Sequence, residues 1–173
     1  MDISTTLIQE LLDKEAIRDC LYRYCRGIDN ADEAALRSAY WPDATDQHGA
    51  YQGNADGFIH YALLSLPNFE LSIHQISNIL IQYQTTSANV ESKFSAIQRM
   101  PDQNGRMQEI FIWGRYADYF EKRNHEWRIA QRTVIYDWLT ETPVNAVNKS
   151  ELFGVRQPIG GQWPTDPIYT VFK

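Results

Sequence analysis

Three polar residues in otherwise apolar segments of this chain carry the side chains needed for acid–base chemistry. Asp29 ends a long segment whose apolar residues recur at helical spacing, His74 begins a strand-like run, and Arg132 lies in the last such run. A carboxylate that faces apolar groups is costly unless a cation or a hydrogen-bond donor meets it. A histidine suits this purpose, because a carboxylate that holds one ring nitrogen leaves the other free as a base near neutral pH. If Asp29 and His74 meet, the sequence predicts a proton-transfer site in an apolar pocket.

Each of these residues also has a purely structural interpretation. Asp29 can solvate the end of its helix, although the helix dipole disfavours a carboxylate there, and His74 can be a hydrogen-bonded histidine of a half-buried strand. Asn78 follows His74 by four residues, so on a regular strand the two share a face, where the amide orients a substrate or bonds an adjacent strand. Arg132 is either a clamp for an anion or phenolate or the partner of a carboxylate such as Asp29 or Asp46.

Two tyrosines are further candidates. Tyr24 precedes Asp29 by a little more than one helical turn, and its hydroxyl can act as an acid or hydrogen-bond donor, or simply pack in the core. Tyr116 is expected to belong half to the core and half to a pocket. The other histidines are interpreted as turn or helix-surface residues without a role: His48, His60 and His125.

The composition limits the class of protein. The 173 residues, 43% hydrophobic and 13% aromatic, are enough for one domain with a sizeable core. The formal net charge is −6 and the basic residues are scattered, which argues against a nucleic-acid partner. The first residues lack a basic region followed by an apolar stretch, and no run approaches a membrane span. We therefore expect no membrane partner and a cytoplasmic location.

The sequence contains no motif for a metal or another cofactor. No Cys/His cluster has zinc spacing and no glycine-rich phosphate loop is present, so neither kind of group is predicted. Cys20 and Cys25 lie on one predicted helix at positions that differ by roughly 140° around its axis. We expect them to point apart, to form no disulfide and to serve as reduced packing residues.

Helical patterns precede strand-like runs along the chain. The helical segments are 4–28, 33–40 and 54–66, with Asp32 as N-cap of the second, and a weak hairpin with its turn at Gly49 covers 44–52. Four sequential strand runs follow, at 71–83, 89–100, 106–121 and 126–138. This order predicts an α+β domain over residues 1–142, in which an antiparallel meander with helices on one face curls around a ligand-binding interior. Residues 143–173 are expected to form a wrapping tail, with these anchors: Phe153, Trp163 and Tyr169.

Six segments in this order resemble the SnoaL-like family of the nuclear transport factor two-like superfamily. They are 15–29, 39–44, 51–53, 74–78, 114–116 and 126–132, and 166–169 resembles a tail ending of the same branch. The resemblance spans nearly the whole chain. It implies a cone-shaped α+β barrel, with N-terminal helices packed on a strongly curved, mostly antiparallel sheet.

The resemblance also implies roles for individual residues. The superfamily includes scytalone dehydratase, hexachlorocyclohexane dehydrochlorinase and bile-acid dehydratase, lyases in which a helix-end aspartate and a strand histidine form a catalytic dyad. Asp29 and His74 occupy those positions here. Tyr24 matches a pocket tyrosine of the bile-acid enzyme. Arg132 and Tyr116 match a pocket arginine and a pocket aromatic of the dehydrochlorinase.

Two further positions are assigned to substrate binding through the same resemblance. Trp41 lies in the matching segment 39–44, and Asp46 stands where the dehydrochlorinase has a tryptophan. That departure implies a more polar pocket and argues against a purely apolar substrate. The second histidine that scytalone dehydratase uses has no clear counterpart.

The resulting prediction is a cofactor-independent lyase that eliminates a leaving group from a small aromatic or alicyclic substrate through an Asp–His dyad. One alternative is an isomerase or cyclase with the same pocket, since ketosteroid isomerase also belongs to the superfamily and uses pocket carboxyl and tyrosine groups. Another is a noncatalytic subunit like the small subunits of ring-hydroxylating dioxygenases. A homo-oligomer, trimer or dimer, is expected because the exposed sheet of a cone needs covering.

Overall fold

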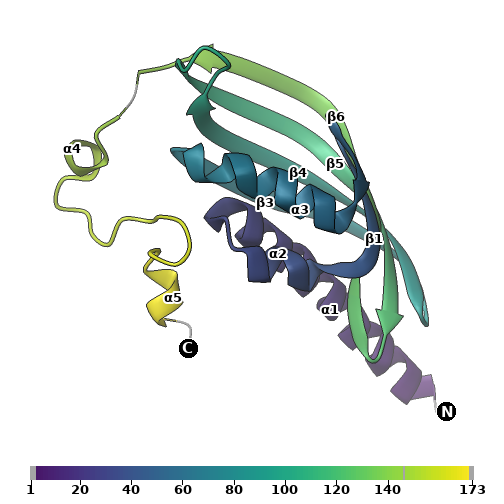
Figure 1. Cartoon of the computed structure of the whole chain (residues 1–173). Coiled ribbons are helices and arrows are strands. Elements are labelled where there is room, and N and C mark those ends of the chain that lie inside the picture. The colour runs from purple at the N-terminus through teal and green to yellow at the C-terminus, as the bar shows by residue number, and fades with distance from the viewer. Residues whose placement is uncertain (1–2, 146, 172–173) are drawn as a thin grey trace.

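The chain folds into a long first helix, two shorter helices and a six-stranded sheet, followed by an irregular C-terminal segment (Figure 1). The computed structural model describes residues 3–145 and 147–171. The helices are α1 (Ile3–Asn30), α2 (Glu33–Ala39), α3 (Ala55–Ser65), α4 (Lys149–Phe153) and α5 (Ile168–Val171), with a 3-10 turn at Leu66–Asn68. The strands are β1 (Tyr40–His48), β2 (Tyr51–Asn54), β3 (Leu71–Gln84), β4 (Ser87–Pro101), β5 (Met107–Arg123) and β6 (Glu126–Pro143). Within the described ranges, no helix is both long and apolar enough to cross a membrane.

Side-chain caps fix the starts of α2 and α3. The Asp32 carboxylate accepts a hydrogen bond from the backbone N–H of Ala35 at 3.0 Å, and the Asn54 side chain accepts one from Gly57 at 2.8 Å. Asp32 is thus the N-cap that the sequence predicts. Helix α1 continues to Asn30, two residues beyond the predicted end, so that Asp29 lies in its last turn.

The strand order in the sheet is β2-β1-β6-β5-β4-β3. Strands β3 to β6 form the predicted antiparallel meander. The turn between β5 and β6 uses Asn124 and His125, both with positive φ, as a tight hairpin requires. The β1–β2 hairpin adds to the edge of β6 through a parallel pairing that places Asp46 beside Arg132. The sheet is therefore mostly antiparallel, as expected.

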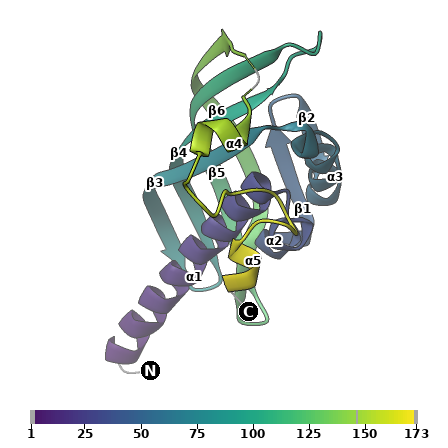
Figure 2. The same ribbon diagram turned by 90° about the vertical axis from the view of Figure 1, so that its left-hand side faces the viewer.

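The three N-terminal helices cover the concave face of the curved sheet (Figures 1 and 2). The apolar side of α1 packs there, with Ile17, Leu21 and Tyr24 fully buried against residues such as Phe120 and Ile129 of the sheet. This arrangement confirms the predicted α+β fold with helices packed on a curved sheet.

Strand β3 contains a bulge that overturns one prediction. Its pairing with β4 shifts between Ser77 and Leu80, and Asn78 takes a φ of 48°. The extra residue reverses the alternation of side chains, so that Asn78 is exposed while His74 remains partly buried. The prediction that Asn78 shares the face of His74 is therefore wrong.

The opposite face of the sheet carries large apolar side chains in solvent. Phe111, Trp113 and Trp138 are 37%, 44% and 65% exposed. Trp113 and Trp138 are directly paired neighbours on β5 and β6, and the Phe111 ring stacks beside Trp113 with centroids 6.0 Å apart. These three residues are called the outer aromatic patch below.

The C-terminal segment returns to the end of α1 (Figure 2). The backbone N–H of Trp163 donates to the carbonyl of Asn30 at 2.7 Å, and the Tyr169 hydroxyl donates to Asp32 at 2.9 Å. The Arg26 guanidinium also lies over the Tyr169 ring, 4.8 Å from its centroid. The segment therefore touches the helix that carries Asp29.

Candidate active site

Asp29 and His74 meet where the last turn of α1 lies against β3. Oδ1 of Asp29 is 2.7 Å from Nδ1 of the His74 ring, and Oδ2 accepts a 2.9 Å hydrogen bond from the His74 backbone N–H. The Ser72 hydroxyl donates to Oδ1 at 3.2 Å. Because an ionised carboxylate only accepts hydrogen bonds, this contact places a proton on Nδ1. Nε2 receives no hydrogen bond from the described residues and remains available as an acceptor.

The His74 ring lies in the wall of a cavity of about 340 Å³ between the helices and the sheet. Aromatic rings from both layers dominate the wall, and most of its polar groups are ring-borne. The wall includes Tyr24, His48, Phe58, His74, Phe94 and Tyr116. A cavity of this size and lining suits a small ring-containing ligand.

Tyr24 and Tyr116, both predicted as site residues, are part of this wall. The Tyr116 ring stacks on Phe94 with centroids 4.4 Å apart, and Tyr24 meets Tyr116 edge-on at 5.6 Å. Burial raises the pKa of Tyr24 well above its ordinary value, so the phenol stays protonated and keeps a proton to donate. Its hydroxyl interacts with that of Tyr116, which lies in the same wall.

Arg132 is a structural cation and does not line the cavity. Its Nε and Nη2 both donate to Asp118 at 2.7 Å, and both side chains are completely buried. The guanidinium packs against the rings of both Tyr24 and Tyr116, 4.0 and 4.1 Å from their centroids. Burial alone would lower the pKa of Arg132, but the adjacent Asp118 outweighs it and raises that pKa well above its ordinary value. The sequence left a clamp and a carboxylate partner as alternatives. The structure favours the partner, yet the carboxylate belongs to Asp118 instead of Asp29 or Asp46.

Asp46 is buried beneath the cavity wall. It accepts a 2.6 Å hydrogen bond from the Tyr40 hydroxyl, and its Oδ1 is 3.4 Å from Nδ1 of His48. The His48 ring stacks on Phe58 with centroids 4.5 Å apart and lines the cavity. Asp46 therefore reaches the cavity through His48, a residue to which the sequence interpretation gave no role. The spacing of Asp46 and His48 indicates that they lie together, because residues two apart on a strand share a face.

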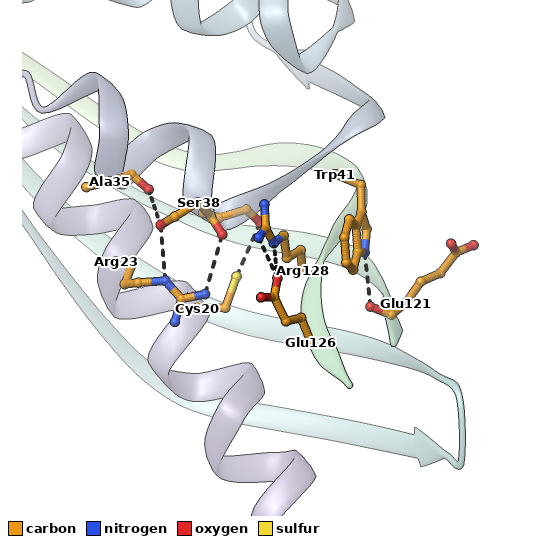
Figure 3. Close-up of polar contacts among 9 residues, drawn as sticks. Cys20, Arg23, Ala35, Ser38, Trp41, Glu121, Glu126 and Arg128 are labelled. Atoms are coloured by element: carbon orange, nitrogen blue, oxygen red, sulfur yellow. Dashed lines mark hydrogen bonds and ion pairs between the residues drawn. The ribbon is translucent and has the colours of Figure 1, made fainter. Parts of the chain in front are cut away.

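Trp41 and Asn78, both assigned to substrate binding, lie away from the cavity wall. The Trp41 indole N–H donates to the carbonyl of Glu121 at 3.0 Å (Figure 3). The guanidinium groups of Arg123 and Arg128 lie over its ring, 5.0 and 4.9 Å from the centroid. Trp41 thus covers the end of the sheet, and the bulge directs Asn78 outward.

A second hollow of about 600 Å³ lies on the other side of Asp29. The end of α1, the start of β3 and the C-terminal segment form its walls, with Asp29, Ser72, Gln162 and Asp166 among the lining residues. The side chains of Asp29 and His74 are 20% and 7% exposed. The pair therefore stands between two hollows, with the acid on one side and the imidazole on the other.

Comparison with solved structures gives the same fold. A hexachlorocyclohexane dehydrochlorinase of type 2 superposes with a TM-score of 0.69 at 20% identity, over 81% of this chain and 94% of that chain. A protein from Novosphingobium aromaticivorans named after scytalone dehydratase gives 0.69 at 22% identity, over 82% and 95%. A type 3 hexachlorocyclohexane dehydrochlorinase from Novosphingobium barchaimii gives 0.66 at 20% identity, over 82% and 98%.

Comparison with proteins of curated function finds no match. The sequence itself matches the SnoaL-like domain over residues 9–133, which includes most of α1, the whole of α2, α3 and β1 to β5, and the Asp29–His74 pair. The chain therefore belongs to the SnoaL-like domain family.

Proposed function

We propose that the protein is a lyase that eliminates a leaving group from a small aromatic or alicyclic substrate. The observation that carries this proposal is the 2.7 Å contact between Asp29 and the His74 ring in the wall of an aromatic cavity. Nε2 of His74 removes a proton from a substrate carbon, and the electrons of the C–H bond form the new double bond as the leaving group departs. Asp29 holds the ring in place and stabilises the imidazolium that forms.

The environment of the pair supports this chemistry. A positioned base contributes roughly a hundred- to ten-thousandfold to a rate. Donors placed where negative charge develops contribute a comparable amount. The protonated Tyr24 hydroxyl in the wall is such a donor. Neither of these contributions requires a cofactor, and a cofactor-independent reaction remains our expectation.

The two alternatives fit the structure less well. An isomerase of the ketosteroid type acts through a carboxylate poised over its ligand, whereas the Asp29 carboxylate is engaged by His74 and Ser72. A noncatalytic subunit has no use for a cavity with an acid-supported histidine in its wall. These observations favour elimination.

The test is turnover of scytalone, of hexachlorocyclohexane isomers and of a panel of cyclic β-hydroxy ketones by the purified protein. Water loss is followed by absorbance and chloride release by ion chromatography. His74→Gln and Asp29→Asn are each expected to lower kcat by about a hundredfold or more, with melting temperatures close to that of the wild type.

His60→Gln is the matched control, because His60 is an exposed residue of α3 outside the cavity wall. It should leave turnover unchanged. Full activity of His74→Gln together with a large loss of stability would identify a structural pair and defeat the proposal. Absence of turnover across the whole panel would count against elimination as the function.

A further inference from the structure

A second acid–histidine pair lies at the cavity wall, and it comes from a different part of the chain than the first. Asp46 and His48 come from β1, whereas Asp29 and His74 come from α1 and β3. Both histidines line the same cavity. The Asp46 side chain is fully buried and that of His48 is 22% exposed, so the acid lies behind the imidazole as seen from the cavity.

Two buried polar atoms of this pair face each other without a regular hydrogen bond. Nδ1 of His48 and Oδ1 of Asp46 are 3.4 Å apart, and neither has another partner within the described residues. An unpaired buried donor or acceptor is costly. Nδ1 is the nearest possible donor to Oδ1, since the carboxylate can only accept, and the 3.4 Å contact between them is that of an ion pair. Nε2 is then the ring nitrogen of His48 that remains for contact with a ligand in the cavity.

The surroundings hold both members in place. The second oxygen of Asp46 is engaged by the Tyr40 hydroxyl at 2.6 Å, and the His48 ring is stacked on Phe58. Asp118, which is also buried on this side of the sheet, is already paired with Arg132. Asp46 is therefore the carboxylate that lies against the His48 ring.

We propose that His48 is the general acid of the reaction and that the substrates of this cavity are hydroxylated ring compounds that lose water. This inference rests on the proposed elimination function. Nε2 of His74 accepts the proton from carbon, and the C–H electrons form the C=C bond. The C–O bond breaks with its electron pair on oxygen, and oxygen takes the proton from Nε2 of protonated His48. Water leaves, His48 becomes neutral and His74 becomes charged, so that atoms and charge balance.

The leaving group determines whether the rate of elimination depends on this acid. Hydroxide is a poor leaving group and needs a proton, whereas acetate leaves as a stable anion. The test therefore compares 3-hydroxycyclohexanone with 3-acetoxycyclohexanone, which lose water and acetate to give the same enone, followed by its absorbance. His48→Gln should lower kcat for the hydroxy ketone by about a hundredfold or more and change that for the acetoxy ketone by less than about threefold.

The variants of the first pair separate this inference from the proposed function. His74→Gln should lower turnover of both ketones, and His60→Gln should lower neither. Equal losses on both ketones in His48→Gln, or no loss on either, would overturn His48 as the acid while leaving His74 as the base. Failure of the wild type to convert the hydroxy ketone would overturn the assigned substrate class.

The tautomer of His48 gives a readout without substrate. Nitrogen NMR of histidine-labelled protein should show the neutral His48 ring protonated at Nδ1. In Asp46→Asn, the Tyr40 hydroxyl should still donate its hydrogen bond to the oxygen of the new amide. The amide N–H₂ group then faces Nδ1 of His48, so Nδ1 becomes the acceptor and the ring proton should move to Nε2. A wild-type ring protonated at Nε2 would overturn the pairing on which the inference depends.

Discussion

At the scale of single residues, the hydrogen bonds of Asp29 decide which nitrogen of His74 can act. Three donors from the start of β3 reach this carboxylate: the His74 ring, the His74 backbone and the Ser72 hydroxyl. The ring can therefore neither turn over nor change its tautomer without breaking a charge-assisted bond. The backbone N–H of His74 and the hydroxyl of Ser72, two residues before it on β3, thus help to fix the orientation of the proposed base.

Removal of the Ser72 hydroxyl tests this orientation directly. Ser72→Ala leaves the other two bonds to Asp29, so we expect kcat to fall by about tenfold, equivalent to about 1.4 kcal/mol, with an unchanged KM. Steady-state kinetics on whichever panel compound the wild type turns over measures the effect. A fall as large as that of His74→Gln would mean that Ser72 has a role of its own in the chemistry.

The two cysteines illustrate residues that burial makes inert. Burial raises the pKa of Cys20 to about 11 and that of Cys25 to about 12. Both are free and buried, and Cys20 donates to the carbonyl of Ala39 at 3.2 Å (Figure 3). We expect iodoacetamide at pH 7.5 to leave both thiols unlabelled in the native protein and to label both in urea, as measured by intact mass. Rapid labelling of the native protein would contradict this expectation.

Individual contacts were predictable where residue types and the family resemblance agreed. The meeting of Asp29 and His74 was expected because a carboxylate and an imidazole complement each other and because the two residues match the dyad positions of related lyases. The partner of Arg132 was missed, since Asp118 faces it only through the pairing of β5 with β6. His48 was missed because its turn position suggested exposure, although its spacing from Asp46 indicated a shared face.

At the scale of elements, helix α1 is held on the sheet by polar contacts as well as by its buried apolar side chains. Near the middle of α1, Asp13 receives a 2.7 Å contact from Lys122 of β5 and a 2.8 Å hydrogen bond from Tyr83 of β3. Burial opposes the charge of Asp13, but these bonds outweigh it and lower its pKa below the ordinary 3.8. The helix is thereby tied to two strands at once.

This tie predicts a pH-dependent contribution to stability. A carboxyl whose pKa is lower in the folded state stabilises the fold fully above its unfolded pKa, about 3.8, and loses that effect as the pH falls through the folded value. Asp13→Asn should therefore lower the free energy of unfolding at pH 7 by more than at pH 3. Urea unfolding at both values measures the difference. An equal loss at the two pH values would show that the charge of Asp13 contributes nothing.

Most elements followed from the sequence, and the exceptions have a common physical cause. Helix caps, the hairpin turn at Gly49 and the four long strands have local signals. The bulge in β3 has none, because an extra residue is accommodated only through the register with β4. The parallel pairing of β1 with β6 likewise joins two strands that are far apart in the sequence. No local pattern in either strand predicts that pairing.

At the scale of the whole molecule, the outer aromatic patch is one apolar surface that the single chain leaves uncovered. Its two tryptophans are paired neighbours in the sheet and yet face solvent. Exposed apolar patches of this kind mark interaction surfaces. The expected homo-oligomer stays a prediction, and this patch is the surface through which we expect it to form.

The oligomeric state is open to a direct measurement. Sedimentation equilibrium should give a mass of two or three chains for the wild type, and Trp138→Lys should shift it toward one. Val155→Lys is a suitable control, because Val155 is 97% exposed and lies in the C-terminal segment. A wild type that sediments as a single chain would contradict the prediction.

The position of the Asp29–His74 pair between two hollows has a consequence for how a catalytic cycle ends. The larger hollow lies beneath the C-terminal segment and exposes the carboxylate of Asp29. The proposed substrate binds in the other cavity, next to the His74 ring. Solvent can therefore reach the carboxylate from behind while a product still occupies the cavity. The captured proton on Nε2 faces the cavity, so the base is restored only after the product has left.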